Sequence, residues 1–168
     1  ETGGSVRLPA SYCGIYGLKT TYGVLSRWGV VAYGSSLDQV GILGHTPQDI
    51  ALPLSVMSGV DFYDDTSADL PDAKPSVEAF SDFSKLKIAV PKQFLESKGM
   101  DADVAKVFEE TRGWFESKGA KIEVVDLPIL DAAIASYYVI ALSEAASNLS
   151  RFDGIRYGNR IDNGKGYD

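Results

Sequence analysis

The sequence of 168 residues has little of several residue types on which common protein sites depend. Cys13 is the only cysteine, so no internal disulfide can form, which fits a reducing compartment. We interpret Cys13 as a small buried apolar residue. His45 is the only histidine, and no His, Cys and carboxylate spacing is typical of a metal site. We therefore expect no metal at this chain and no Ser-His-Asp triad based on His45.

Three further absences narrow the function. We find no run of about 18 apolar residues, and so predict no membrane span. The net charge of -7 argues against direct binding to nucleic-acid phosphates, which needs a basic face. No Gly-Lys-Ser/Thr pattern or GxGxxG follows an expected strand, so a nucleotide-binding loop is disfavoured. The chain also lacks an initial methionine, and we expect it to be an internal piece of a longer protein.

The feature most indicative of chemistry is Thr2-Gly3-Gly4-Ser5. Two residues without a Cβ let main-chain N–H groups approach a bound carbonyl closely. Such donors can hold the negative oxygen that forms when a serine attacks an amide or ester. Three interpretations stay open from the residues alone: Ser5 caps a helix, the loop binds an anion, or Ser5 is a nucleophile beside an oxyanion hole.

A nucleophilic serine needs a group that accepts its proton. His45 lies among polar residues, and Lys19, the nearest lysine, has no defined geometry toward Ser5. The proton acceptor is therefore missing from this chain, or the protein is not a hydrolase.

The pattern predicts an α/β protein. Lys87–Pro91, an amphipathic helix over 101–118 and a strand over 121–125 form a β–α–β unit, which builds parallel sheets. We expect other short strands at 14–19, 22–26, 30–33 and 40–44, and other helices at 6–11, from Thr46 to Gly59, and at 130–152. Pro53 should kink the second of these helices. Residues 60–83 and 153–168 should be irregular.

The helix expected over 130–152 is apolar enough to be largely buried. Its Tyr137 and Tyr138 are either core aromatics or place one hydroxyl in a pocket. Glu144 and Asn148, one turn apart, would need partners if buried and could then form a polar network that shapes that pocket.

Several motifs together resemble the amidase signature family. The core is Thr2-Gly3-Gly4-Ser5-Val6-Arg7-Leu8-Pro9-Ala10-Ser11-Tyr12-Cys13-Gly14, followed by Gly17-Leu18-Lys19. Ser26-Arg27-Trp28-Gly29 and Ser35-Ser36-Leu37-Asp38-Gln39 extend it. The stretch over 137–158 is similar, within this family, to glutamine-hydrolysing subunits of tRNA amidotransferases. Glu1 departs from the family pattern, in which a shorter aspartate braces the loop.

The resemblance implies a mixed, mostly parallel sheet flanked by helices, of which residues 1–168 are the central part of a single amidase domain, truncated at both ends. It also implies a Ser–cis-Ser–Lys triad. Ser5 matches the nucleophile, and Thr2, Gly3 and Gly4 match the oxyanion hole. Tyr137 or Tyr138 matches the tyrosine beside bound glutamine. The lysine and cis-serine of the family precede this segment.

The implied activity is release of ammonia from glutamine for ATP-dependent amidation of misacylated Glu-tRNA(Gln) or Asp-tRNA(Asn) in the cytoplasm. The implied partners are B and C subunits, with charged tRNA held mainly by the B subunit. No cofactor is expected on this chain, while ATP and Mg serve the complex. A general amidase of the same family and a non-catalytic assembly protein are the alternatives.

Overall fold

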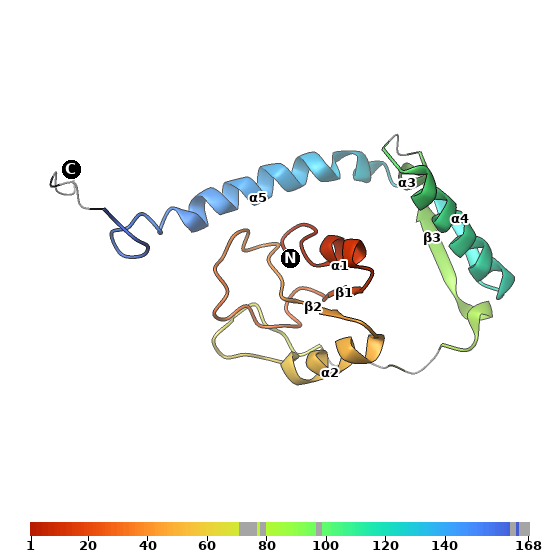
Figure 1. Cartoon of the computed structure of the whole chain (residues 1–168), viewed down its shortest axis with the longest axis horizontal. Coiled ribbons are helices and arrows are strands. Elements are labelled where there is room, and N and C mark those ends of the chain that lie inside the picture. The colour runs from red at the N-terminus through yellow and green to blue at the C-terminus, as the bar shows by residue number, and fades with distance from the viewer. Residues whose placement is uncertain (71–76, 78–79, 97–98, 162–163, 165–168) are drawn as a thin grey trace. The chain divides into compact units, whose positions relative to one another are not determined.

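The computed structural model describes residues 1–70, 77, 80–96, 99–161 and 164. These form two compact units (Figure 1). The first comprises Glu1–Val77 with Tyr137–Asp168, and the second comprises Glu78–Ser136. Both contain helices and a two-stranded sheet, so the expected α/β class is confirmed.

An antiparallel ribbon organises the first unit. Strand β1 (Tyr16–Lys19) pairs with β2 (Gly41–Gly44), with Tyr16 opposite Gly44 and Lys19 opposite Gly41. The buried core combines residues of the ribbon, of the loop that joins the strands and of the following helix: Val24, Leu25, Ile42, Ile50 and Leu54.

Helix α1 (Arg7–Cys13) lies against this ribbon and fixes the loop that precedes it. A Cβ on Gly17 would stand 2.7 Å from the Ala10 Cβ, and one on Gly41 would stand 2.8 Å from the Val6 Cγ2. Both glycines therefore allow a close approach that other residues would block. The helix expected over 6–11 is confirmed, and Gly14 ends it with a left-handed φ of 65°.

Helix α2 (Pro47–Met57) begins where the sequence predicts. The Thr46 hydroxyl accepts from the Asp49 N–H at 3.1 Å, and the Asp49 carboxylate accepts from the Thr46 N–H at 2.9 Å. This reciprocal pair is a capping box. The helix continues through Pro53, which leaves the Asp49 carbonyl without its usual N–H donor.

The second unit contains the expected β–α–β pattern. Strand β3 (Lys87–Pro91) and strand β4 (Lys121–Val125) are parallel, and α4 (Ala102–Ser117) connects them. The sequence did not predict the short elements around them: the 3-10 turns η2 (Phe83–Lys85) and η3 (Pro128–Ala132), and helix α3 (Lys92–Leu95).

Two expected strands are wrong. Residues 30–33 are irregular, and residues 22–26 contain only an isolated bridge from Leu25 to Ser58. Gly23 and Gly29, with φ of 88° and 82°, turn the chain before either run can pair. The described strands make one antiparallel and one parallel pair, so a mostly parallel sheet is not confirmed.

The irregular connection is confirmed for 60–70, whereas residues 71–76 and 78–79 of it lie outside the described residues. The described residues 153–161 likewise contain turns and bends and no helix or strand, while 162–163 and 165–168 lie outside the description. Cys13 is exposed rather than buried: it is the last residue of α1, directly before the turn at Gly14.

Helix α5 (Ala133–Leu149) corrects the expectation of a largely buried helix. Only Ala141 and Ala145 are buried, while larger apolar side chains such as Val139 and Leu142 are exposed. Residues Pro128–Leu149 are also long and apolar enough, by length and composition alone, to cross a membrane, which leaves the expectation of no span a prediction. A single segment of this kind is weak evidence for a span.

Candidate functional site

The loop Thr2–Ser5 presents a row of main-chain donors. Within the described residues, the N–H groups of these four consecutive positions have no hydrogen-bond acceptor. The next two N–H groups, of Val6 and Arg7, both donate to Glu1 Oε2 at 2.9 Å. Buried or half-buried N–H groups normally find a partner in protein, water or ligand. The loop therefore has the donors needed to hold a negative oxygen.

Ser5 ends this row of donors and is exposed. Within the described residues its hydroxyl has no hydrogen-bond partner. The N-cap of α1 is Val6, without a side-chain capping bond, so the interpretation of Ser5 as a helix cap is wrong. The Ser5 hydroxyl remains available for chemistry.

The Glu1 carboxylate holds the end of the loop. It also accepts from Arg7 Nε at 2.7 Å and from Nη2 of the same guanidinium at 2.5 Å, and Nη2 reaches the Gly3 carbonyl at 3.3 Å. Burial acts to raise the pKa of Glu1, but the hydrogen bonds from Arg7 and Val6 and the Arg7 charge outweigh it and lower the pKa. The Glu1 carboxylate thus ties the Val6 and Arg7 N–H groups and the Arg7 guanidinium to the first residue of the chain segment that carries the loop.

No base reaches Ser5 within the described part of the chain. His45 is exposed on the connection between β2 and α2. The Lys19 ammonium donates to the Thr20 carbonyl at 2.9 Å and to Gln39 Oε1 at 3.3 Å. In the described structure neither residue is hydrogen-bonded to Ser5, and that neither serves as its proton acceptor stays a prediction.

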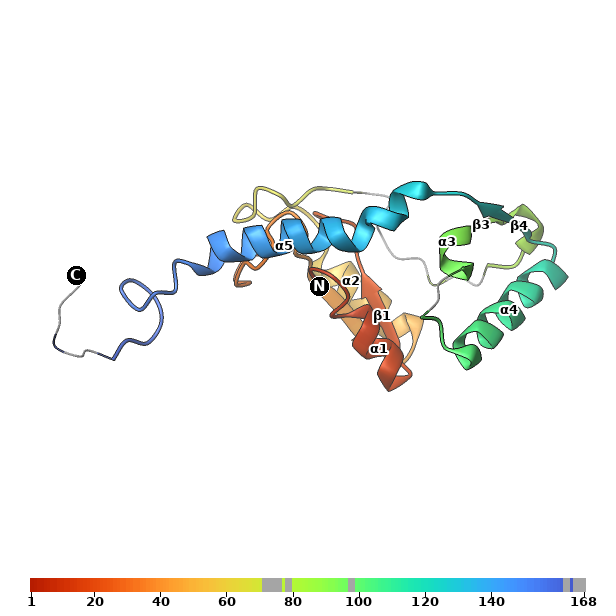
Figure 2. The ribbon, with the colours of Figure 1, turned by 90° about the horizontal axis from the view of Figure 1, so that it is seen from above.

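Helix α5 passes beside the Thr2–Ser5 loop (Figure 2). Its two adjacent tyrosines differ in their contacts with that loop. A Cβ placed on Gly3 would stand 2.7 Å from the Tyr137 hydroxyl oxygen. Tyr137 is half-buried, whereas Tyr138 is 56% exposed and contacts Tyr137 edge to face. Tyr137 is therefore the tyrosine that lies against the Thr2–Ser5 loop.

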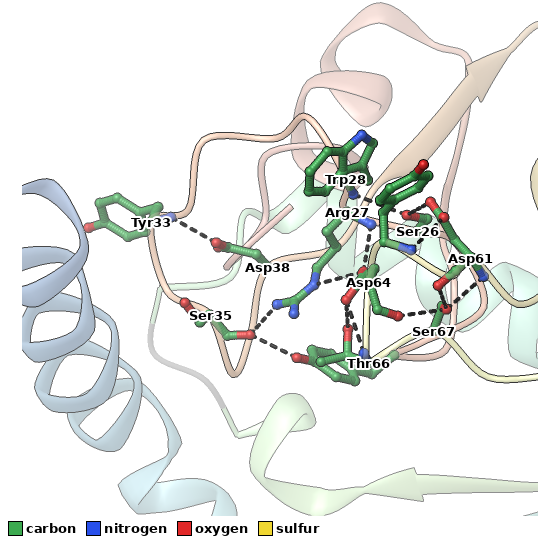
Figure 3. Close-up of polar contacts among 12 residues, drawn as sticks. Ser26, Arg27, Trp28, Tyr33, Ser35, Asp38, Asp61, Asp64, Thr66 and Ser67 are labelled. Atoms are coloured by element: carbon green, nitrogen blue, oxygen red, sulfur yellow. Dashed lines mark hydrogen bonds and ion pairs between the residues drawn. The ribbon is translucent and has the colours of Figure 1, made fainter. Parts of the chain in front are cut away.

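A buried carboxylate that the sequence did not single out supports the loop from its other side. Asp38, 6% exposed, accepts from the Thr2 hydroxyl at 2.5 Å and from the Gly34 N–H at 3.0 Å. It also accepts from the Tyr33 N–H at 2.8 Å (Figure 3). The signal that could have found it is its place four residues after Gly34, where an Asp side chain can bond back to a tight turn.

The turn 33–36 is also bonded to α5. Glu144 accepts from the Ser36 N–H at 2.9 Å and the Ser36 hydroxyl at 2.5 Å. The Asn148 amide donates to the Tyr33 carbonyl at 3.0 Å and to Ser35 Oγ at 2.9 Å. The hydrogen bonds from Ser36 lower the pKa of Glu144. The predicted polar network of Glu144 and Asn148 therefore exists, although Glu144 is not buried by the chain.

Arg27 forms a second polar cluster behind the turn (Figure 3). Its Nη1 donates to the Ser35 carbonyl, and its Nε lies 3.5 Å from Asp64 Oδ2. A cavity of about 270 Å³ opens here, and Ser5 does not line it. Its lining includes Arg27, Trp28, Ser35, Asp38 and Asp64. This cluster supports the turn through Ser35, and its cavity shares Asp38 with the Thr2 end of the loop.

Comparisons with known proteins agree on one family. The amidase family profile matches residues 1–167. The A subunit of the glutamyl-tRNA(Gln) amidotransferase of Treponema denticola is 58% identical over 171 residues, covering 100% of this chain and 35% of the relative. The corresponding A subunit from Clostridium botulinum (strain Kyoto / Type A2) is 50% identical, covering 98% of this chain and 34% of the relative.

A solved structure gives the same result. The crystal structure of the A subunit of the glutamyl-tRNA(Gln) amidotransferase from Thermotoga maritima superposes with a TM-score of 0.71 at 39% identity, covering 88% of this chain and 32% of that one. The chain thus spans about a third of the length of the relatives it matches.

Proposed function

Because the chain belongs to the amidase family, we propose that it is the central part of the glutamine-hydrolysing A subunit of a tRNA amidotransferase, with Ser5 as its nucleophile. The observation that carries this proposal is the exposed, unpartnered Ser5 hydroxyl at the end of four consecutive main-chain N–H groups that have no acceptor in the described structure. The similarity to A subunits of glutamyl-tRNA(Gln) amidotransferases supports the choice of substrate and assembly.

The proposed reaction begins at the side-chain amide of glutamine. Ser5 Oγ loses its proton to a base and bonds to the amide carbon, whose oxygen becomes negative. The N–H groups of Thr2, Gly3, Gly4 and Ser5 then stabilise that oxygen, and loss of one such donor typically costs about 10²- to 10³-fold in kcat. The carbon–nitrogen bond breaks as the leaving nitrogen takes a proton, which yields ammonia and a γ-glutamyl ester on Ser5. Water hydrolyses the ester to glutamate.

The proton acceptor in this proposal lies outside residues 1–168. Lys19 and His45 do not reach Ser5 within the described structure. The family resemblance supplies the candidates, a lysine acting through a serine in cis configuration. Tyr137 would border the bound glutamine, because its hydroxyl lies against Gly3.

The whole protein's role follows as part of the same proposal. Ammonia released at Ser5 would pass to a B subunit that holds the charged tRNA, while ATP and Mg serve the complex and a C subunit joins the other two. The net charge of -7 suits a subunit that leaves RNA phosphates to its partner. No metal or cofactor is assigned to this chain, and the cytoplasm is the proposed location.

The test replaces Ser5 by alanine in the full-length protein. We expect Ser5→Ala to abolish ammonia release from glutamine, because no acyl-enzyme can form. Ser11→Ala, an exposed serine on α1, is the matched control and should retain activity. Normal turnover by Ser5→Ala would overturn the proposal.

A second measurement separates this function from that of a general amidase. The assembled complex should transfer glutamine-derived nitrogen to Glu-tRNA(Gln) or Asp-tRNA(Asn) only when ATP is present. Hydrolysis of small amides at an equal or higher kcat/KM than glutamine, with no transfer to tRNA, would identify a general amidase instead.

A further inference from the structure

The Asp38 carboxylate is built into the structure as an anchor. It is 6% exposed and receives three hydrogen bonds, from the Thr2 hydroxyl and from the N–H groups of Tyr33 and Gly34. A buried carboxylate is costly unless its oxygens are paired in this way. Hydrogen bonds to a charged group are also shorter and stronger than neutral ones. Asp38 therefore fixes the groups that it binds more firmly than a neutral side chain would.

Thr2 is the residue of the Thr2–Ser5 loop that hydrogen-bonds to Asp38. Its hydroxyl to Asp38 Oδ1 distance is 2.5 Å, and its methyl group would stand 3.0 Å from a Cβ on Gly34. Residue 39 adds a main-chain tie, since the Gln39 N–H donates to the Glu1 carbonyl at 3.0 Å. The start of the loop is thus held by residues 38 and 39, and its end by the Glu1 carboxylate through Val6 and Arg7.

The other two donors connect Asp38 to helix α5. Tyr33 and Gly34 begin the turn that Glu144 and Asn148 bind from the helix. The same helix places the Tyr137 hydroxyl against Gly3. Asp38 therefore ties the oxyanion loop to the turn, and the turn is tied to the helix that borders the site.

We propose that Asp38 is a positioning residue of the oxyanion hole: by holding the Thr2 hydroxyl and the 33–34 turn together, it sets where the N–H groups of Thr2–Ser5 point. The proposal rests on the proposed function, in which those groups stabilise the negative oxygen. Catalytic donors must be held within a few tenths of an ångström of their productive positions. Loss of the anchor should therefore lower kcat more than it alters KM, because the donors act mainly in the transition state.

The test uses the full-length, assembled enzyme and two near-isosteric changes. In Asp38→Asn, an amide N–H₂ would oppose one of the three donors, and in Thr2→Val the hydroxyl is lost with little change of volume. We expect each variant to lower kcat for glutamine about ten- to a hundredfold, with KM changed less than about threefold. Thr2→Ser keeps the hydroxyl and should restore most of kcat.

A double-mutant cycle then asks whether the two residues act together. The combined Thr2→Val and Asp38→Asn variant should lose clearly less than the product of the two single losses, since Thr2→Val removes a hydrogen bond that Asp38→Asn weakens. Asp61→Asn is the matched control: Asp61 holds its own loop through Ser26 at 2.5 Å and Tyr63 at 2.9 Å and has no bond to Thr2. Its kcat should stay within about twofold of wild type.

The outcomes separate the inference from the function on which it rests. If Ser5→Ala is inactive while folded Asp38→Asn and Thr2→Val keep wild-type kcat, the positioning role is refuted and the proposed nucleophile stands. Multiplicative losses in the cycle, or equal losses in Asp61→Asn, would also refute the positioning role. Full turnover by Ser5→Ala would instead overturn the proposed function.

Discussion

At the residue scale, the site depends on which main-chain groups are paired and which are not. Glu1 and Asp38 hold the two ends of a short loop through charge-assisted hydrogen bonds. Between them, the N–H groups of Thr2–Ser5 have no acceptor in the described chain. The carboxylates bind the Thr2 hydroxyl at one end of the loop and the Val6 and Arg7 N–H groups at the other, so the four N–H groups between them are held in place and available.

A substitution at Gly3 tests whether the loop needs a residue without a Cβ beside Tyr137. Gly3→Ala would place a Cβ 2.7 Å from the Tyr137 hydroxyl oxygen, so the loop or the tyrosine must move. We expect kcat for glutamine in the full-length enzyme to fall about a hundredfold, as for a displaced oxyanion donor. Gly4→Ala, whose Cβ would meet only the Leu8 Cβ at 3.8 Å, should lose less activity. Equal losses in the two variants would contradict the steric explanation.

Asp38 makes a pH-dependent contribution to stability. Burial acts to raise its pKa, but the hydrogen bonds from Thr2, Gly34 and Tyr33 and the charge of Arg27 outweigh it and lower the pKa below 3.8. The stabilising contribution is therefore fully present above the unfolded-state pKa and is lost as pH falls through the lower folded-state value.

The direction of the Asp38 pKa shift predicts how the difference in Tm between wild type and Asp38→Asn depends on pH in the full-length protein. The Tm gap between them should be larger at about pH 7 than at about pH 3, because below the unfolded-state pKa the unfolded chain binds a proton that the hydrogen-bonded carboxylate of the folded protein resists. A gap of equal size at both pH values would show that the carboxylate charge does not contribute.

Candidate site residues could be recognised from the sequence where they are neighbours along the chain. Residues without a Cβ directly before a serine drew attention to Gly3, Gly4 and Ser5, but left a cap, an anion loop and a nucleophile open until the family resemblance favoured the last. Asp38 was missed as a support because its three donors include a hydroxyl 36 residues away, and local spacing does not report such a contact.

At the element scale, α5 connects otherwise separate parts of the site. Over about three turns it presents Tyr137 to the loop and Glu144 and Asn148 to the turn. Its small residues Ala141 and Ala145 are the buried ones, which lets the helix backbone approach the first unit closely.

The adjacent tyrosines of α5 provide a matched pair of variants. Tyr137→Phe should raise KM for glutamine about three- to tenfold, because a hydroxyl beside Gly3 is removed from the substrate side. Tyr138→Phe, which alters a largely exposed ring, should leave both constants unchanged. Steady-state kinetics of the two full-length variants measure which tyrosine affects kcat and KM for glutamine. A larger effect in Tyr138→Phe would reverse the assignment.

Elements were predicted well where local signals agree, and poorly where pairing depends on distant chain. The Thr46–Asp49 capping box and the β–α–β unit follow from nearby residues. Residues 30–33 are β-branched and apolar enough for a strand but find no partner in the described chain. The burial of α5 failed because apolar composition does not tell which surface covers a helix.

At the scale of the whole molecule, the described chain holds the proposed nucleophile Ser5 and its main-chain donors, with no side-chain base hydrogen-bonded to Ser5 among the described residues. We predict that purified residues 1–168 release no ammonia from glutamine, while the full-length protein does. The physical reason is that Ser5 has no proton acceptor here, since Lys19 is bonded to the Thr20 carbonyl and Gln39. Ammonia release from 1–168 that disappears in its Ser5→Ala variant would show that a base is present within the chain.

The most direct test of the account is to trap the covalent intermediate. The full-length enzyme, mixed with glutamine and quenched in acid within the first turnovers, should carry one γ-glutamyl ester, which peptide mass spectrometry should place on Ser5. We predict this adduct in wild type and its absence in Ser5→Ala. An ester on another side chain, or undiminished ammonia release without any adduct in a Ser5→Ala enzyme, would contradict the central claim.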